Sequence, residues 1–372
     1  MHNQPDNIRI MISGGGTGGH VFPAIAIAEA LKSRLKNVDF LFVGAHGKME
    51  MEKVPAAGYK IEGLTIAGLQ RRLTWKNLSL PFKLIKSLRK AKKLVKNYDP
   101  HIVIGVGGYA SAPVLRVASK RNIPALIQEQ NSFPGITNRI LGKSVDRICV
   151  AYDNMERFFP KEKLYVTGNP VRENLLAIQT PSAEARAYFG LEDEKMTILV
   201  MGGSLGARSI NQGVMHALKD MVDKDVQLIW QTGKYFIEEA TEALKQIDTN
   251  NIYITDFISR MDLAYASADL VVSRAGAIAI SEIQAVEKPS ILVPSPNVAE
   301  DHQTKNAKAL VNYNAAVLLR DEQAPEMLGK EMLRIIMDKQ LLSRLHENVA
   351  KLAKKDAAQT IAGVVIDMIK VN

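Results

Sequence analysis

The chain has 372 residues, of which 47% are hydrophobic and 23% charged, and its formal net charge is +9. This length suits two domains, and the composition excludes a disordered protein. The single cysteine, Cys149, excludes an internal disulfide framework and a zinc site built mainly from thiolates. No apolar run approaches the ~18 residues that span a bilayer, and residues 1–7 lack the features of a signal peptide, so we expect a cytoplasmic protein.

Short, apolar, β-rich runs alternate with helical patterns along the chain. In the first half, the predicted strands are Ile8–Ser13, Val38–Val43, Ile102–Gly105, Ala125–Gln128, Arg147–Ala151 and Leu164–Thr167. In the second half, they are Thr197–Met201, Gln227–Gln231, Ile252–Thr255, Leu270–Ser273, Ser290–Val293 and Ala316–Leu319. Continuous apolar strands separated by helices indicate parallel sheets covered on both faces. We therefore predict an α/β protein with two doubly wound, Rossmann-like domains of about six strands each.

The boundary between the domains is predicted at the punctuated stretch Gly168–Arg172, which gives domains of residues 1–170 and 171–352. The region Leu342–Ile369 has a helical pattern throughout. Ligands of doubly wound domains bind at the carboxyl ends of the strands. We therefore expect two facing domains with the site in the cleft between them.

A glycine-rich loop, Gly14–His20, follows the first strand, and a helix is predicted from about Pro23. Glycines let a backbone approach a ligand, and a helix N-terminus offers N–H groups to its oxygens. The loop formally fits G-x-G-x-x-G, but residues 40–46 contain no acid that could hold a ribose, and no Lys-Ser/Thr follows the glycines. The loop is therefore neither a full dinucleotide motif nor a P-loop, and a plain tight turn remains an alternative.

His20 lies where this loop becomes the helix. The positive end of a helix disfavours an imidazolium ion, so we expect a neutral imidazole. A neutral imidazole can accept the proton of a sugar hydroxyl, which is the task of a general base. The alternative is a capping histidine that fixes the shape of the loop.

A second glycine loop, Gly202–Arg208, follows the strand Thr197–Met201. It repeats the strand–glycine–helix arrangement of the first half and adds a hydroxyl. Ser204 could donate to a phosphate oxygen together with backbone amides. The alternative is a close strand–helix turn without a ligand.

Two further loops of the second half carry polar groups. After Leu270–Ser273, small residues open a helix with Glu282 in its second turn, and a carboxylate there could accept both hydroxyls of a ribose. The alternative is a buried acid paired with Arg274. Residues 300–307 open another helix and suit hydroxyl recognition on a sugar, although Asp301 could be a plain N-cap.

Common metal-binding motifs are missing from the sequence. The sequence has no His-Glu-x-x-His, no Cys-x-x-Cys and no calcium-loop pattern. We therefore expect neither a metal nor another cofactor. The leaving diphosphate would be stabilised by helix N-termini, Ser204 and an arginine.

The excess positive charge is concentrated in the segment Leu69–Lys96, which has ten basic residues and no acid. Such a field indicates an anionic partner, either lipid headgroups or nucleic acid. On a helical wheel of residues 83–95, apolar residues lie opposite lysines, and this also fits a solvated face on a core-packed helix. The preceding apolar and aromatic stretch favours an anionic membrane surface. The expected membrane contacts are Arg71, Arg72, Trp75, Lys76, Leu80 and Phe82.

Five motifs together resemble the MurG family of membrane-associated bacterial transferases, which make lipid II. They are Gly15–Pro23, Glu129–Asn131, Gly168–Arg172, Gly202–Arg208 and Ser281–Glu282, and the similarity runs from about residue 8 to beyond residue 310. The resemblance implies the GT-B fold, with a final helix at about 353–372 packed back onto the N-terminal domain. That domain would bind the acceptor and the membrane, and the C-terminal domain would bind the donor.

The resemblance also implies an activity. N-acetylglucosamine (GlcNAc) would pass from UDP-GlcNAc to the C4 hydroxyl of the muramoyl sugar in lipid I, with inversion, during peptidoglycan synthesis. The enzyme would be peripheral, at the cytoplasmic face of the bacterial inner membrane.

Site residues follow from the same resemblance. His20 is the first candidate for the general base, and Glu129 is the second. The implied donor contacts are Thr17, Gly18, Gly19, Asn131 to a sugar hydroxyl, Arg172 and Ser204 to phosphate, Ile258 to uracil through its backbone, Ala277, Ile278, Ala279, Ile280, Ser281 and Glu282 to sugar and ribose, and Gln303 to the sugar. The family often has two adjacent glutamines where this chain has Gln303 and Thr304, which leaves a secondary sugar contact open.

Other functions remain as alternatives. The nearest is another GT-B sugar-nucleotide enzyme, such as a UDP-GlcNAc 2-epimerase or a lipid glycosyltransferase. A non-catalytic sugar-nucleotide sensor is a further alternative. A nucleic-acid-binding protein would use the basic segment but would leave the glycine loops without a role, so we expect no nucleic-acid partner.

Overall fold

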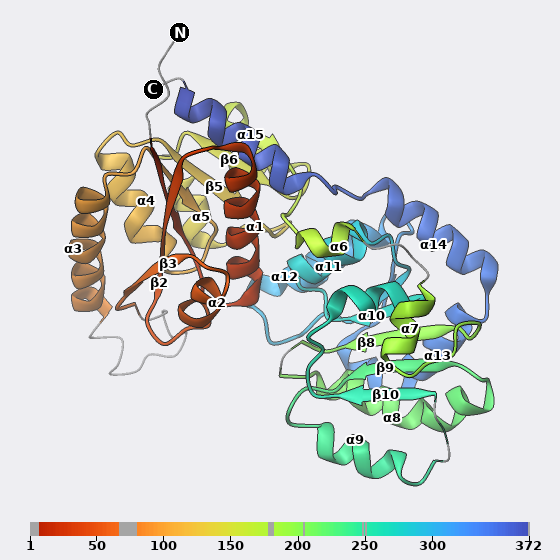
Figure 1. Ribbon diagram of the computed structural model, residues 1–372. Coiled ribbons are helices and arrows are strands. Elements are labelled where there is room, and N and C mark those ends of the chain that lie inside the picture. Colours follow the sequence, from red (N-terminus) through yellow and green to blue (C-terminus); the bar gives the residue numbers. More distant parts are fainter. Residues whose placement is uncertain are drawn as a thin grey trace. The chain divides into compact units, whose positions relative to one another are not determined.

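The computed structural model describes residues 7–66, 80–177, 182–203, 205–247, 249 and 251–370, which form two compact α/β units (Figure 1). Unit 1 comprises Met1–Arg172 and Asp356–Asn372, and unit 2 comprises Glu173–Lys355. Each unit has one sheet in which every pair of neighbouring strands is parallel. The predicted fold class of two doubly wound domains is confirmed.

The sheet of unit 1 has seven strands in the order β3-β2-β1-β4-β5-β6-β7. Their bounds are β1 Ile8–Ser13, β2 Val38–Ala45, β3 Lys60–Leu64, β4 Ile102–Gly105, β5 Ala125–Glu129, β6 Arg147–Val150 and β7 Leu164–Val166. The sequence prediction missed β3. This edge strand alternates charged residues with Ile61 and Gly63, so it lacks the continuous apolar run of a central strand.

Helices cover both faces of this sheet. They are α1 Gly18–Arg34, α2 Glu50–Ala56, α3 Leu80–Tyr98, α4 Ser111–Lys120, α5 Ile136–Leu141 and α15 Ala357–Lys370, with short 3₁₀ turns at Met155–Arg157 and Lys161–Lys163. Alternate residues of β1 point to opposite cores: Ile10 and Ile12 pack with α1 and α15, while Met11 packs with α3 and α4. Figure 1 shows α15 lying beside α1.

Two helix boundaries differ from the prediction. Helix α1 begins at Gly18 and contains Pro23 in its second turn. The prediction started this helix at about Pro23, because proline is most favoured in the first turn of a helix. The predicted continuous helix Leu342–Ile369 is two helices, α14 Lys339–Lys351 and α15, because the chain turns between them. This turn contains neither glycine nor proline, so the sequence gives no strong signal for it.

The sheet of unit 2 has six strands in the order β10-β9-β8-β11-β12-β13. The strands are β8 Thr197–Met201, β9 Gln227–Gln231, β10 Ile252–Thr255, β11 Leu270–Ser273, β12 Ser290–Leu292 and β13 Val317–Leu318. The helices are α6 Glu173–Leu176, α7 Ala183–Tyr188, α8 Arg208–Asp223, α9 Ile237–Leu244, α10 Met261–Ser267, α11 Ala277–Ala285, α12 His302–Val311, α13 Ala324–Ile336 and α14, with 3₁₀ turns at Ala299–Asp301 and Asp321–Gln323. Two hydrophobic cores, one on each face, hold these layers together.

Candidate functional site

The strand order reverses between β1 and β4 in unit 1, and between β8 and β11 in unit 2. In open parallel sheets, ligands bind beyond the carboxyl ends of the strands at such a reversal. The loops after these strands lead into helices α1, α4, α8 and α11. The glycine loop of each unit therefore lies at the edge where this fold binds ligands.

The glycine loop after β1 packs against the loop after β4. Gly16 has a φ of 93° and Gly108 a φ of 81°, a region that glycine adopts without strain. A β-carbon on Gly108 would lie 2.3 Å from the carbonyl oxygen of Gly15. The two loops thus approach each other at a distance that no side chain at Gly108 would allow.

A buried carboxylate holds this glycine loop from behind. Glu50, in the first turn of α2, accepts the amide hydrogen of Gly16 at 2.8 Å and that of Ala45 at 2.9 Å. Residues 40–46, at the end of β2, contain no acid. Glu50 follows a few residues later and binds the amide of Ala45, the last residue of β2. Because both oxygens of Glu50 accept backbone amides of the protein, its role is to stabilise the glycine loop.

His20 lies in the first turn of α1, with Thr17 as the N-cap residue. Its Nδ1 is 3.3 Å from Oγ1 of Thr17. A β-carbon on Gly107 would lie 2.9 Å from Nε2 of His20, so the Nε2 edge of the ring faces the loop after β4. When Nδ1–H donates to Thr17, Nε2 carries the lone pair and can accept a proton.

Glu129, at the end of β5, is buried and holds two asparagines. Its Oε1 accepts the backbone amide of Asn131 at 2.9 Å and the side-chain amide at 3.1 Å, and its Oε2 accepts the side-chain amide of Asn138 at 2.8 Å. Burial raises the pKa of Glu129, and these hydrogen bonds oppose that rise. The arrangement fixes the side chain of Asn131 relative to the sheet.

A chain of buried amides joins two of the sequence motifs to the loop after β4 inside unit 1. Gln128 donates to Oδ1 of Asn169 at 2.8 Å, and Asn169 donates to the carbonyl oxygen of Gln130 at 2.9 Å. Gln130 in turn donates to the carbonyl oxygen of Val106, in the loop after β4, at 2.7 Å. The motifs at 129–131 and 168–172 are thus built into one network with that loop.

The predicted phosphate ligand Arg172 lies beside the start of α1. Its guanidinium carbon is 5.7 Å from the ring centre of Phe22. A β-carbon on Gly18 would lie 3.1 Å from the same ring. Arg172 is therefore in the same part of unit 1 as the predicted residues Thr17, Gly18 and Gly19.

In unit 2, the glycine loop after β8 packs against the turn after β9. Gly206 has a φ of 81°, and a β-carbon on it would lie 2.2 Å from the carbonyl oxygen of Thr232. A β-carbon on Gly233 would lie 2.2 Å from the amide nitrogen of Gly206. Both glycines are thus required by the close approach of the two loops. Ser204 lies outside the described residues.

The buried side chain of Gln231, the last residue of β9, bridges this glycine loop to the loop after β10. Its Nε2 donates to the carbonyl oxygen of Gly203 at 3.0 Å, and its Oε1 accepts the amide hydrogen of Ile258 at 3.0 Å. The amide of Ile258, one of the two backbone groups expected at the uracil, is therefore used within the protein. The sequence analysis did not identify Gln231.

Helix α11 begins after Gly276 and has no acid in its first turn. Ala277, Ile278 and Ala279 are partly exposed there, whereas the side chain of Ile280 is fully buried in the core. Ser281 donates to the carbonyl oxygen of Ala277 at 2.9 Å. Of the predicted run, Ile280 can reach a ligand only through its backbone.

The alternative interpretation of Glu282, a buried acid paired with Arg274, is wrong. Oε2 of Glu282 accepts the hydroxyl of Tyr265 at 3.3 Å, and the glutamate is mostly buried. Arg274 pairs with Asp321 and donates to the carbonyl oxygen of Val293 at 3.2 Å. Glu282 is thus held by a neutral phenol, and Arg274 secures the loop after β12.

Gln303, in the first turn of α12, fixes the preceding loop. Its Oε1 accepts the amide hydrogen of Ser295 at 2.8 Å. Asp301 is the N-cap by position, but its side chain accepts no helix amide and is bonded by Oγ1 of Thr304 at 2.6 Å. Thr304, where the family often has a second glutamine, thus binds the helix start.

Most of the expected membrane contacts lie beyond what the structure describes. Arg71, Arg72, Trp75 and Lys76 lie outside the described residues, as do the side chains of Leu80 and Phe82. Over the described ranges, no cluster of three or more His, Cys, Asp or Glu side chains could hold a metal ion. Within the same ranges, no helix combines the length and apolarity needed to cross a bilayer.

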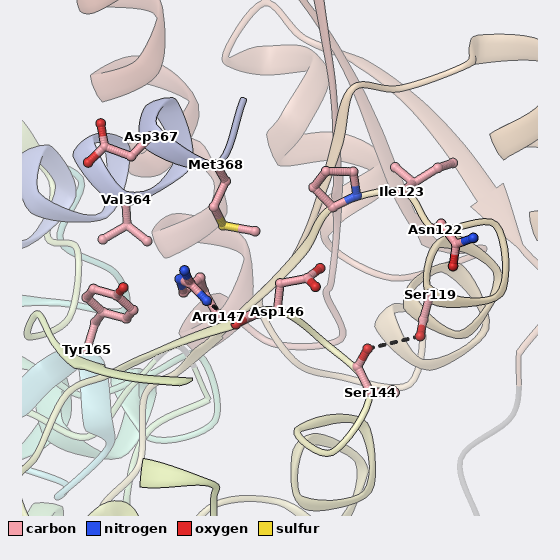
Figure 2. Close-up of a pocket in the computed structure, with 11 residues that line it drawn as sticks. Ser119, Asn122, Ile123, Ser144, Asp146, Arg147, Tyr165, Val364, Asp367 and Met368 are labelled. Carbon is pink, nitrogen blue, oxygen red and sulfur yellow. Dashed lines mark hydrogen bonds between the residues drawn. The ribbon is translucent and has the colours of Figure 1, made fainter. Parts of the chain in front are cut away.

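A separate cavity of about 600 Å³ lies in unit 1 at the amino ends of β5 and β6. Figure 2 shows Val364 and Met368 of α15 on one side of it and Ser119 and Asn122 on the other. The cavity is at the edge of the sheet opposite to the carboxyl ends, and none of the predicted site residues lines it. It is therefore not the site that the glycine loops form.

Comparisons with known proteins match nearly the whole chain. The glycosyltransferase family 28 N-terminal domain matches residues 10–150, and the family 28 C-terminal domain matches residues 197–361. A relative from Phocaeicola vulgatus is 53% identical over 358 residues, which are 96% of this chain and 95% of that protein. One from Cytophaga hutchinsonii is 50% identical over 364 residues, 98% of each chain. Both are named UDP-N-acetylglucosamine–N-acetylmuramyl-(pentapeptide) pyrophosphoryl-undecaprenol N-acetylglucosamine transferase.

Solved structures of glycosyltransferases and related enzymes share this fold. The crystal structure of Acinetobacter baumannii MurG has a TM-score of 0.78 and 28% identity, covering 97% of this chain and 99% of that one. The UDP-GlcNAc 2-epimerase of Neisseria meningitidis has a TM-score of 0.68 at 12% identity, covering 98% of this chain and all of that one, and it shows a shared fold alone. The resemblance drawn from the motifs is confirmed, and the chain belongs to glycosyltransferase family 28 and, within it, to the MurG family.

Proposed function

We propose that this protein transfers GlcNAc from UDP-GlcNAc to the C4 hydroxyl of the muramoyl sugar in a polyprenyl-diphosphate-linked acceptor, giving lipid II. The observation that carries the proposal is the identity of about half of all residues, over nearly the full chain, to proteins named for this transfer. In support, the described parts of the five motifs lie in loops and helices that follow the carboxyl ends of strands. The protein would act as a peripheral enzyme at the cytoplasmic face of the inner membrane.

The uridine and most of the other donor contacts are assigned to unit 2. The amides at the start of α11 and the loop after β8 would receive the diphosphate and the sugar, since helix N-termini favour anionic oxygens. Glu282 would accept the ribose hydroxyls, and Gln303 would contact the sugar. Because Gln231 already accepts the amide of Ile258, the uracil contact at this residue would use its carbonyl oxygen.

The acceptor is assigned to unit 1, with His20 as the base. Nε2 would take the proton of the C4 hydroxyl while that oxygen attacks the anomeric carbon and the bond to UDP breaks. The electron pair of that bond leaves on the β-phosphate. Thr17 would hold Nδ1–H and keep the lone pair on Nε2. One displacement of this kind inverts the anomeric carbon.

Glu129 is the second candidate for the base, and its geometry favours a supporting role. Both carboxylate oxygens accept hydrogen bonds from asparagines of the same unit. A base needs a free lone pair directed at the substrate. We therefore assign Glu129 to holding Asn131, which would contact a sugar hydroxyl.

A cationic face of unit 1 supports membrane association. Helices α3 and α4 lie side by side, and neither contains an acid. Leu84 and Ile85 of α3 are 56% and 47% exposed, among exposed cations that include Lys86 and Arg89. Exposed apolar groups ringed by cations suit an anionic leaflet. Further along α3, Ala91 and Val95 are buried, so that end of the helix packs on the core.

The test is transfer of labelled GlcNAc from UDP-GlcNAc to a lipid-linked muramoyl-pentapeptide acceptor. Labelled product should form only when the acceptor is present. If the protein instead converts UDP-GlcNAc to an epimer without an acceptor, the epimerase alternative holds. Binding of UDP-GlcNAc with no conversion under either condition would mark a sensor.

A further inference from the structure

The side chain of Gln231 lies between two loops. In the proposed function, these loops bind different parts of the donor. The loop containing Gly203 is assigned to the diphosphate, and Ile258 is assigned to the uracil. The Gln231 side chain donates to the first and accepts from the second, at 3.0 Å in each case. We infer that Gln231 is a positioning residue that couples recognition of the uracil to recognition of the diphosphate, and this inference rests on the proposed function.

The two hydrogen bonds need a group that can donate and accept at once. A glutamine amide offers a carbonyl oxygen and an NH₂ on neighbouring atoms, so one side chain satisfies both loops. A glutamate at this position would keep the bond from Ile258 but would set a second acceptor against the carbonyl oxygen of Gly203. A methionine would keep the volume and lose both bonds.

The surroundings leave these loops little freedom to move separately. Gly206 and Gly233 are in backbone contact, closer than any β-carbon would permit. Asn211, on α8, donates to the carbonyl oxygen of Thr232 at 2.8 Å and so ties α8 to the turn after β9. Gln231 completes this set by adding the loop after β10. A shift of any one loop would be transmitted to the next.

Gln231 would act through the two loops without touching the donor, because its side chain is buried. The bond to Ile258 orients the backbone that meets the uracil. The bond to Gly203 orients the amides that meet the diphosphate. Ligands that contain only part of the donor should therefore report on the effect of each hydrogen bond separately.

The experiment measures the dissociation constants of uridine and UDP, by calorimetry, for the full-length protein and two variants. Uridine reports on the Ile258 loop, and the ratio of the two constants reports on the diphosphate loop. Gln231→Glu should bind uridine as the wild type does, and its gain in affinity from uridine to UDP should fall about five- to tenfold. Gln231→Met adds no charge. It should bind uridine more weakly than the wild type, and its increase in affinity from uridine to UDP should also be smaller.

Gln227 provides a matched control on the same strand. It is a buried glutamine at the opposite end of β9, and it also bridges backbone groups, accepting the amide hydrogen of Glu192 at 2.7 Å and donating to its carbonyl oxygen at 2.8 Å. Gln227→Met should lower the melting temperature as Gln231→Met does. Its uridine and UDP constants should equal those of the wild type.

Three results would be decisive. A normal gain from uridine to UDP in Gln231→Glu would overturn the inference while leaving the proposed function intact. Equal losses of both ligands in Gln227→Met and Gln231→Met would reduce Gln231 to a stabilising residue and would overturn it too. If the wild type binds neither ligand, the proposed function itself fails.

Discussion

The carboxylate of Glu50 accepts the amide hydrogen of Gly16 at 2.8 Å, and its other oxygen accepts that of Ala45 at 2.9 Å. The glycine loop of unit 1 is thus shaped by an acid from the following helix. This bond removes the Gly16 amide from the set of groups that could meet a phosphate. The loop is therefore held by the protein itself, whichever substrate it receives.

Replacing Glu50 should therefore loosen the loop. In Glu50→Gln, one backbone amide faces an NH₂ group, and leaving a buried donor unsatisfied costs about 1–3 kcal/mol. We expect a lower melting temperature and a lower kcat/KM. Glu52→Gln, on the exposed side of the same helix, should change neither. A normal melting temperature and kcat/KM in Glu50→Gln would show that the loop does not depend on this acid.

His20→Ala should lower kcat by roughly 10²–10⁴-fold, the usual contribution of a general base. UDP binding should change little, because His20 is assigned to the acceptor hydroxyl and not to the uridine or the diphosphate. The measurements are steady-state transfer and calorimetric binding of UDP. His216→Ala, at an exposed position on α8, should leave kcat unchanged. Turnover at the wild-type rate in His20→Ala would remove this residue from the chemistry.

Glu129→Gln separates the two candidate bases. The variant loses hydrogen bonds from asparagines to a charged acceptor, each worth ~1.5–3 kcal/mol, so kcat/KM should fall about tenfold or more. The acid limb of the pH profile should remain, because His20 is assigned as the titrating base. Loss of that limb in Glu129→Gln would transfer the role of base to Glu129.

Lys288 makes the stability of the protein depend on pH. Burial lowers the pKa of its ammonium group to about 8, Asp269 opposes that shift, and Arg186 adds to it. An unfolded lysine titrates near 10.4, so between about pH 8 and 10.4 the unfolded chain holds the extra proton. The free energy of unfolding should therefore gain of the order of 3 kcal/mol from this group as the pH rises through that window.

The comparison for Lys288 is with Lys288→Met, measured by urea unfolding from pH 7 to 10.5. The variant has no group at this position to titrate, so the difference between the two pH curves isolates Lys288. Below pH 8 the cost of the buried charge is fully present in the wild type. Parallel curves across the whole range would show that the ammonium group is not desolvated in the folded protein.

The membrane proposal predicts a loss of vesicle binding on charge reversal. Changing Arg71, Arg72 and Lys76 to glutamate should weaken binding to anionic vesicles, since each basic group near the surface contributes ~1 kcal/mol. Leu84→Ser with Ile85→Ser should weaken it through lost apolar contact. Reversal of Lys195, which pairs with acids on unit 2, serves as the control. Unaltered vesicle flotation of the triple variant would retire the membrane assignment.

The sequence predicts the fold well because most of the described strands are apolar runs between helical patterns, and the central ones are fully buried. It misses β3 because an edge strand is charged on alternate positions. It places the start of α1 at Pro23 because local rules favour proline in the first turn, whereas the loop geometry starts the helix at Gly18. These errors arise where tertiary contacts, and not local preference, decide the boundary.

In the candidate site, too, local patterns are predictable from the sequence and tertiary contacts are not. Glycine loops and polar helix starts are visible in the sequence because they follow buried strands. Glu50 and Gln231 are not visible, since each binds backbone groups on other elements and no local pattern marks such a bond. The alternative pairing of Glu282 with Arg274 fails for the same reason, because Arg274 pairs with Asp321, which is distant in sequence.

The most direct test of the account is the structure of the product formed from UDP-GlcNAc and the lipid-linked acceptor, in the presence of EDTA. We expect acceptor-dependent transfer that the chelator does not reduce. We also expect a β-linkage to the C4 oxygen, seen in the proton NMR coupling of the new anomeric centre, because a single displacement with His20 as base inverts the α-linked donor. An α-linkage, or transfer that stops with EDTA, would contradict it.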